Sequence, residues 1–238
     1  MSKNTNTKVP NPENPSSLKS RYEIRKLEPH HLQWVNAIMC HSNTFHSGVW
    51  PLIYDDIGGR VLKLVDGLEY LVKHQIDSGL SYGVFDTEYE YKTEEAKKVG
   101  GKLYWNSEEP GVFEEQGLKA EGERLLEQMD FPLVSVALSY DGAHPLDMTK
   151  MADAMEALPH FGLIYHVLGD LDTRDPASWQ ATAPGEVLMR NGTSTRNDYE
   201  GEKIMSGMAR WLIREAAAKG YRGIQIECLA DAVSFHLA

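Results

Sequence analysis

The strand-forming and helix-forming segments of this chain follow one another along the sequence, and this order most constrains its fold. The run Phe131–Tyr140, FPLVSVALSY, is the strongest strand signal and is apolar enough to lie in the centre of a sheet. Shorter strand patterns cover residues 21–27, 81–86, 183–195 and 221–228. Because strands and helices interleave, the sequence predicts an α/β fold with a mixed sheet covered by helices.

Apolar residues at helical spacing predict the helices. They cover residues 28–40, 60–78, 147–158 and 201–219, and a further helix is expected to start at Leu229. Gly79 and Gly220 follow two of these segments and are typical helix stop signals. Residues 88–128 hold eleven Glu against six Lys and Arg, which indicates a solvated excursion of helices and loops. We therefore expect an enlarged middle segment, residues 88–180, inside a single domain that spans residues 21–238.

Charge and composition exclude several classes of function. The chain of 238 residues carries 24 basic and 35 acidic side chains, a net charge of -11, and has no cluster of five basic residues, so we expect no nucleic-acid partner. No apolar run approaches the roughly 20 residues of a membrane-spanning helix, and residues 1–20 lack the apolar core of a signal peptide. These residues are polar and predict a disordered leader. Two cysteines make no disulfide framework, and a cytoplasmic location without a membrane partner is expected.

The junction between the strand that ends at Thr195 and the helix expected to begin near Gly201 can carry chemistry. The first N–H groups of a helix have no acceptor within the helix, and with the positive end of the helix dipole they suit a phosphate or pyrophosphate. Gly201 has no Cβ, so a ligand can approach the backbone closely. The side chains of Arg196 and Lys203 could add charge-assisted contacts.

From Tyr199 to Val233 the chain resembles the GNAT superfamily of N-acetyltransferases. Asp198-Tyr-Glu-Gly-Glu-Lys203, followed by Ile204, aligns with the superfamily's coenzyme A motif at the start of a helix. The apolar helix, the Gly-Tyr-Arg-Gly turn that begins at Gly220, and the next strand into Leu-x-x-Ala-Val also have counterparts. The N-terminal pattern Tyr22–Arg25 with the helix at 28–40 is similar to the superfamily's first strand and helix.

The resemblance implies a GNAT-like acyl-CoA N-acyltransferase fold with acetyl-CoA as cosubstrate. The strand before the motif would then pair its backbone with the pantetheine arm through Val187, Leu188 and Met189, or through residues 192–195, depending on where the strands separate. The pyrophosphate would be held by the backbone N–H groups of the motif, which belong to Gly201, Glu202, Lys203 and Ile204. The reaction would be direct acetyl transfer to an amine of a small molecule or a peptide.

Two residues are candidates for moving the amine proton. Glu227, at the end of the last predicted strand, is the first choice as general base, and the structural alternative is a surface carboxylate at a strand end. His46 lies in the loop after the first helix, where it could carry a proton while Trp50 forms a wall of the acceptor pocket. Four histidines between residues 30 and 46 lack the spacing of a zinc site, so no metal is expected.

Two alternatives stay open. Superfamily members continue through a helix and two more strands, whereas this chain stops at Ala238, so the resemblance predicts missing C-terminal strands. This early end and the carboxylates of the motif favour a non-catalytic CoA-binding or scaffold protein as the alternative function. A homodimer, in which a second copy supplies the sheet edge, is the other alternative.

Overall fold

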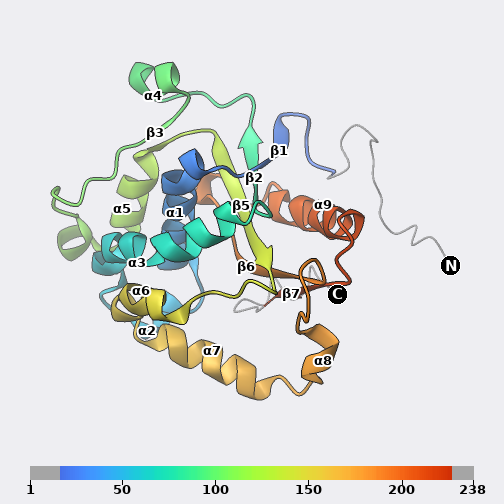
Figure 1. The fold of residues 1–238 in the computed structure, drawn as a ribbon. Coiled ribbons are helices and arrows are strands. Elements are labelled where there is room, and N and C mark those ends of the chain that lie inside the picture. Colours follow the sequence, from blue (N-terminus) through green and yellow to red (C-terminus); the bar gives the residue numbers. More distant parts are fainter. Residues whose placement is uncertain (1–16, 227–238) are drawn as a thin grey trace.

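The computed structural model describes residues 17–226, which are built around a five-stranded sheet (Figure 1). In spatial order the strands are β1 (Tyr22–Lys26), β2 (Tyr82–Asp86), β5 (Leu133–Asp141), β6 (Val187–Thr195) and β7 (Gly223–Ile226). Neighbouring strands are antiparallel except β6 and β7, which are parallel. The mixed α/β sheet predicted from the sequence is confirmed.

The central strand β5 is the one that the sequence marked most strongly. Its first eight residues are buried, as are all five residues of β2. The strand starts two residues later than Phe131 because Pro132 has no N–H to donate to a neighbouring strand. Just before it, β4 (Met129–Asp130) pairs instead with β3 (Lys102–Leu103) in a separate two-stranded sheet.

Helices cover both faces of the large sheet (Figure 1). On one face lie α1 (Leu32–His41), which follows the 3-10 turn η1 (Pro29–His31), and α3 (Ile57–Asp77). On the other face α9 (Ile204–Ala218) buries Ile204, Met208 and Leu212 against β5 and β6. Residues three and four apart share one side of a helix, so this spacing turns a single apolar stripe toward the sheet.

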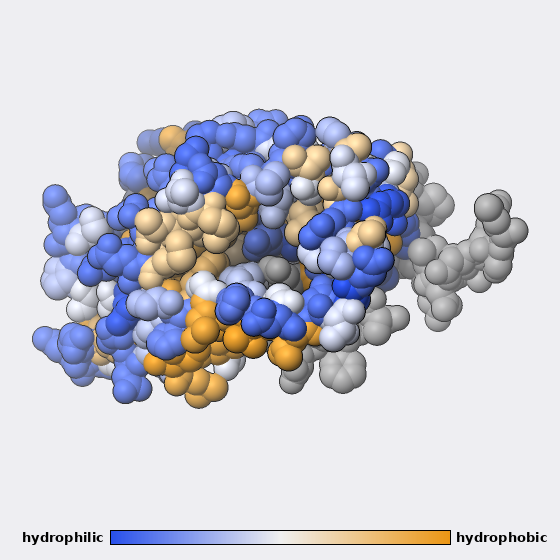
Figure 2. Space-filling model, turned by 60° about the horizontal axis from the view of Figure 1, so that its bottom comes forward, coloured by the Kyte–Doolittle hydropathy of each residue, from blue (hydrophilic) through white to orange (hydrophobic). Residues whose placement is uncertain are grey.

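The middle segment supplies most of the remaining elements. These are α4 (Glu94–Val99), α5 (Phe113–Glu127), η3 (Met148–Met151), α6 (Ala152–Ala157), α7 (His160–Leu171) and α8 (Pro176–Trp179). The predicted helix at 147–158 corresponds to η3 and α6, whereas α7 and α8 were not predicted. Helix α7 has no buried residue, and Leu163 and Leu171 are 55% and 72% exposed. Apolar side chains accordingly gather on the face where α7 lies (Figure 2).

Between α1 and α3 the chain makes two short helical pieces, the π-helix η2 (Ser42–His46) and α2 (Trp50–Ile53). A π-helical turn is rare and frequently occurs at functional sites. Between residues 17 and 226, no helix is long and apolar enough to cross a membrane. Domain boundaries at 1–20 and 21–238 stay a prediction, since the leader lies mostly outside the described residues.

Candidate functional site

The region that the sequence analysis identified as the candidate site consists of strand β6, the loop after it, α9 and β7. Strand β6 ends at Thr195 as predicted, but α9 begins at Ile204 instead of Gly201. The helix starts three residues later than predicted because of the backbone conformation before it. Gly201 and Lys203 have φ angles of +80° and +61°, in the left-handed region that a right-handed helix excludes. Gly201 thus lies in the turn before the helix, and Lys203 is its N-cap residue.

The start of α9 leaves backbone donors free. Lys203 makes no side-chain cap, and the first backbone bond of the helix runs from the Gly207 N–H to the Lys203 carbonyl at 3.1 Å. Within residues 17–226, the N–H groups of residues 201–206 have no hydrogen-bond acceptor. A Cβ added at Gly201 would meet no atom within 4 Å, so the space beside this backbone is open. Free donors at the positive end of a helix dipole suit an anionic ligand.

The acidic side chains around this turn are mostly paired. The Asp198 carboxylate binds the Arg196 guanidinium, and the Glu202 carboxylate forms an ion pair with Lys19. Glu200 is exposed, and Lys203 is an exposed cation at the helix start. Because two of the three carboxylates are neutralised by partners, the turn is less repulsive to an anion than its sequence indicates.

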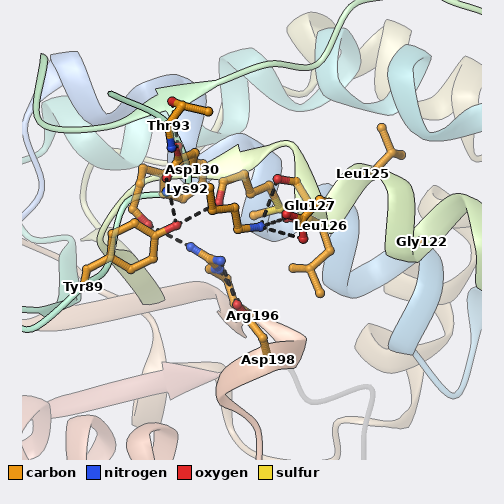
Figure 3. Close-up of polar contacts among 12 residues, drawn as sticks. Tyr89, Lys92, Thr93, Gly122, Leu125, Leu126, Glu127, Asp130, Arg196 and Asp198 are labelled. Carbon is orange, nitrogen blue, oxygen red and sulfur yellow. Dashed lines mark hydrogen bonds and ion pairs between the residues drawn. The ribbon is translucent and has the colours of Figure 1, made fainter. Parts of the chain in front are cut away.

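The Arg196 side chain is fully buried, and Figure 3 shows it among polar groups from several elements. Its Nε and Nη2 donate to both oxygens of Asp198 at 3.1 and 2.8 Å, and its Nη1 donates to the Phe131 carbonyl at 2.8 Å. The guanidinium also lies 5.3–5.7 Å from the ring centres of Tyr89, Phe131 and Tyr199. These partners hold the guanidinium inside the protein. This burial argues against a contact between the Arg196 side chain and a bound pyrophosphate, which stays a prediction.

A second polar cluster supports the same turn from β1 and β2. The buried Asp86 carboxylate accepts hydrogen bonds from Arg21 and from the Tyr199 hydroxyl. Burial alone would raise the pKa of Asp86, but these hydrogen bonds outweigh it and lower the pKa. For Tyr199, burial and the hydrogen bond to Asp86 raise the pKa. The turn from Arg196 to Tyr199 is thus fixed to the sheet at two neighbouring points.

The pairing of β6 decides which part of its backbone a ligand can reach. Leu188 and Met189 pair with β5 on one side and with β7 on the other, and Val187 also pairs with β7. The pairing of these backbones with strands argues against the expected pairing of Val187, Leu188 and Met189 with a pantetheine arm, which stays a prediction. The described pairing with β7 covers residues 187–190 and stops at Ile226, the last described residue, so any partner of residues 191–195 on that side lies outside the described residues. The alternative that the sequence left open, pairing of a pantetheine arm with residues 192–195, stays a prediction.

A bulge lies in β6 opposite Leu138 of β5. Ala137 faces Thr193 and Ser139 faces Arg190, so Leu138 stands opposite two residues, Asn191 and Gly192. Gly192 has a φ of +121°, which only glycine adopts readily. A β-bulge bends its strand and commonly occurs next to active sites.

An open cavity of about 250 Å³ adjoins this bulge. Its polar rim is formed by residues 190–194 of β6 and by residues 42, 43, 46 and 47 at η2. Its apolar wall comes from α3, through Leu64, Leu68 and Leu71, and from α7, through Phe161 and Tyr165. Trp50 and His46 both line the cavity.

His46 lies at the cavity beside a second histidine. Partial burial lowers its pKa, and the charge of Glu200 opposes this only in part. The ring of His46 is 5.3 Å from that of His41, whose Nε2 donates to the Gly122 carbonyl at 2.8 Å. Burial lowers the pKa of His41 to about 4. Both imidazoles are therefore neutral at pH 7, and only His46 is exposed enough to take a proton from a ligand.

Two further sequence hypotheses concern other residues. Glu227, the first choice as base, lies outside the described residues, although Ile226 directly before it lines the cavity. Among residues 17–226, no group of three His, Cys, Asp or Glu side chains could hold a metal ion.

Sequence reasoning missed the aromatic wall that α7 provides. The helical periodicity of residues 160–171 was a usable signal, because Phe161, Ile164 and Tyr165 recur at helical spacing. No sequence pattern predicted the pairing of Arg196 with Asp198, because the Arg196 side chain is buried by residues that are distant in sequence.

Comparisons with known proteins bear on the fold. The chain matches no model of a known protein family and no curated protein. Among solved structures it is similar to the C-terminal condensation domain of Ebony in complex with beta-alanyl-dopamine, with a TM-score of 0.52 and 15% sequence identity. The match covers 92% of this chain and 79% of that chain. At this level of identity the likeness shows that the two proteins share a similar fold, which in this chain is a mixed α/β sheet covered by helices.

Proposed function

We propose that this protein transfers an acyl group, acetyl in the simplest case, from a coenzyme A thioester to an amine. The observation that carries the proposal is the free backbone of the β6–α9 turn. Open N–H groups at residues 201–206 lie at the start of α9, a few residues after strand β6 ends. A pyrophosphate matches such an anion site, and the strand directly before it is where the amides of an attached pantetheine arm would reach the sheet.

Each part of the cosubstrate has a place in this arrangement. The backbone N–H groups of Gly201, Glu202, Lys203 and Ile204 would hold the pyrophosphate, with the exposed Lys203 side chain as a nearby cation. The edge of β6 over residues 192–195 would pair with the pantetheine amides and direct the thioester toward the bulge. The cavity beside the bulge would receive the acceptor.

The reaction needs a base and a stabilised carbonyl oxygen. The amine loses a proton, its nitrogen lone pair attacks the thioester carbonyl carbon, and the tetrahedral intermediate expels the thiolate. The amide forms as the C–S bond breaks, and the thiolate takes up a proton to give coenzyme A. His46 is the proton acceptor that we assign, because it lines the cavity and is neutral at pH 7. Glu227 stays a prediction for the same role.

The likeness in fold supports this proposal only in part. The similar solved domain is described as a condensation domain in complex with beta-alanyl-dopamine, an amide of an amine. An acyl transfer to an amine on the same fold agrees with that description. Membership in the GNAT superfamily and the use of acetyl-CoA rest on the motif from Asp198 to Ile204.

Calorimetric titration tests the proposal. We expect acetyl-CoA and CoA to bind, and pantetheine, which lacks the pyrophosphate, to bind at least tenfold more weakly because it forfeits the contacts at the helix start. An absence of heat with acetyl-CoA at protein concentrations of about 100 µM would refute it.

The alternative is a protein that binds CoA without turnover. One observation favours it: no carboxylate of residues 17–226 lines the cavity, so among the described lining residues none can pair through an acidic side chain with the amine. Binding of acetyl-CoA with no release of free thiol across a panel of amines would support this alternative over the enzyme.

A further inference from the structure

The wall of the cavity beside the β6 bulge is apolar over most of its extent. Leu64, Leu68 and Leu71 project from successive turns of α3, and Leu158 lies next to them. These four side chains are at least 96% buried. A wall of packed leucines is preformed, because each member belongs to the core that joins α3 to α6.

Aromatic rings complete this wall on the side of α7. The Phe161 ring stacks near Trp50 at 6.1 Å and 17°, and it lies 4.8 Å from the Tyr165 ring. Three adjacent rings favour a ligand with a flat apolar body, which gains both area and ring contacts. The volume of about 250 Å³ is near the lower end of small-molecule pockets, roughly 300–1,000 Å³.

The charges of the lining disfavour ligands that carry several charged groups. No Asp or Glu of the described chain lines this cavity, and its one cation, Arg190, donates from Nε to the Thr193 hydroxyl at 3.0 Å. A polyamine or an amino sugar would place several ammonium or hydroxyl groups against leucines without acceptors, which is costly. A single amine group could remain at the polar rim, near His46 and the β6 bulge.

We propose that this cavity binds the apolar body of the acceptor, a primary amine that carries one aryl group. That this amine is acylated rests on the proposed function, whereas its binding in the cavity is independent of it. The aryl group lies between the leucines of α3 and Phe161, and the amine nitrogen lies at the rim beside His46.

Direct binding to the full chain tests this assignment with three amines: 2-phenylethylamine, spermidine and glucosamine. We expect calorimetry to give the highest affinity for 2-phenylethylamine, with and without CoA. Higher affinity for spermidine or glucosamine would overturn the proposal. So would an absence of heat with 2-phenylethylamine at about 1 mM, the weak limit of ordinary ligand affinity.

A pair of variants on one helix locates the binding. Phe161→Ala removes the central ring of the wall and should weaken 2-phenylethylamine about tenfold, since burial of an aromatic ring accounts for that much. Leu163→Ala, on the exposed part of the same helix, is the matched control and should leave the affinity unchanged. Both variants should fold, because α7 contributes no buried residue, and circular dichroism checks this. Equal affinities in the two variants would refute the location.

A titration with hexanoyl-CoA separates the acceptor from the other candidate occupant, a long acyl chain. If Phe161→Ala weakens hexanoyl-CoA and spares 2-phenylethylamine, the cavity holds the acyl chain and the proposal fails. If 2-phenylethylamine depends on Phe161 but no CoA thioester binds, the amine site stands and the proposed function fails. The two results are therefore distinguishable.

Discussion

Arg196 and Asp198 are two residues apart in sequence, and the buried guanidinium of the first binds both carboxylate oxygens of the second at 3.1 and 2.8 Å. The pair closes the chain into a compact turn directly after β6. Through the Phe131 carbonyl, Arg196 also ties this turn to the segment before β5. A turn held in this way fixes the position of the N–H groups that follow it, at residues 201–206.

Asp198→Asn should destabilise the fold by about 2 kcal/mol, because it leaves a buried guanidinium without its counter-charge. Urea unfolding at pH 7 measures the change. Asp172→Asn is the matched control: Asp172 accepts the same two bonds from Arg174, at 2.8 and 2.6 Å, but that arginine is exposed to solvent. We expect little effect of the control. Equal effects of both variants would show that burial of Arg196 does not matter.

Gly201→Trp should weaken acetyl-CoA binding at least tenfold, because an indole would occupy the open space beside the free N–H groups. The substitution also strains a backbone at φ +80°, at a cost of about 1–2 kcal/mol in stability. Gly220→Trp controls for this strain at the other end of α9, where φ is +91° and the surroundings are equally open. Unchanged affinity in Gly201→Trp, measured by calorimetry, would place the cofactor elsewhere.

His41 should make the protein less stable in mild acid. Burial lowers its pKa to about 4 from an ordinary value of 6.5, so the unfolded chain binds the proton more readily than the folded one between these values. The stabilisation is present above pH 6.5 and is lost as the pH falls toward 4, by up to about 3 kcal/mol.

Urea unfolding at several pH values between 7 and 4.5 would reveal this slope. His41→Gln should flatten it, although the buried His31, whose pKa burial also lowers to about 4, keeps a contribution of its own. His166→Gln, at a side chain 73% exposed, should leave the slope unchanged. A slope that His41→Gln does not alter would mean that His41 titrates normally.

His46→Gln should reduce kcat by a factor of about 10²–10⁴, the usual contribution of a general base, while the affinity for acetyl-CoA stays within twofold. In the unaltered enzyme, kcat/KM should rise with pH through a pKa below 6.5, because burial lowers the pKa of His46. The variant should lose this rise. A full pH profile that survives in His46→Gln would transfer the role of base to another residue, with Glu227 the first to test.

The sequence by itself determined the parts that depend on local pattern. The continuous apolar run in β5 and the helical spacing in α3 and α9 predict these elements, because a central strand is buried on both faces and side-chain direction along a helix follows from backbone geometry alone. The sequence also placed His46 and Trp50 in the loop after α1, because it already showed which two helices that loop connects.

Only the tertiary structure decided which groups of the site are available. Val187, Leu188 and Met189 were expected to pair with a ligand, and in the fold the backbones of all three pair with β7. A charged residue such as Arg196 is expected at the surface from sequence alone, but packing against Phe131 and Tyr199 buries its guanidinium. The cavity joins α3, α7 and β6, which are far apart in the chain. Its shape and charge follow from contacts between segments that no local pattern records.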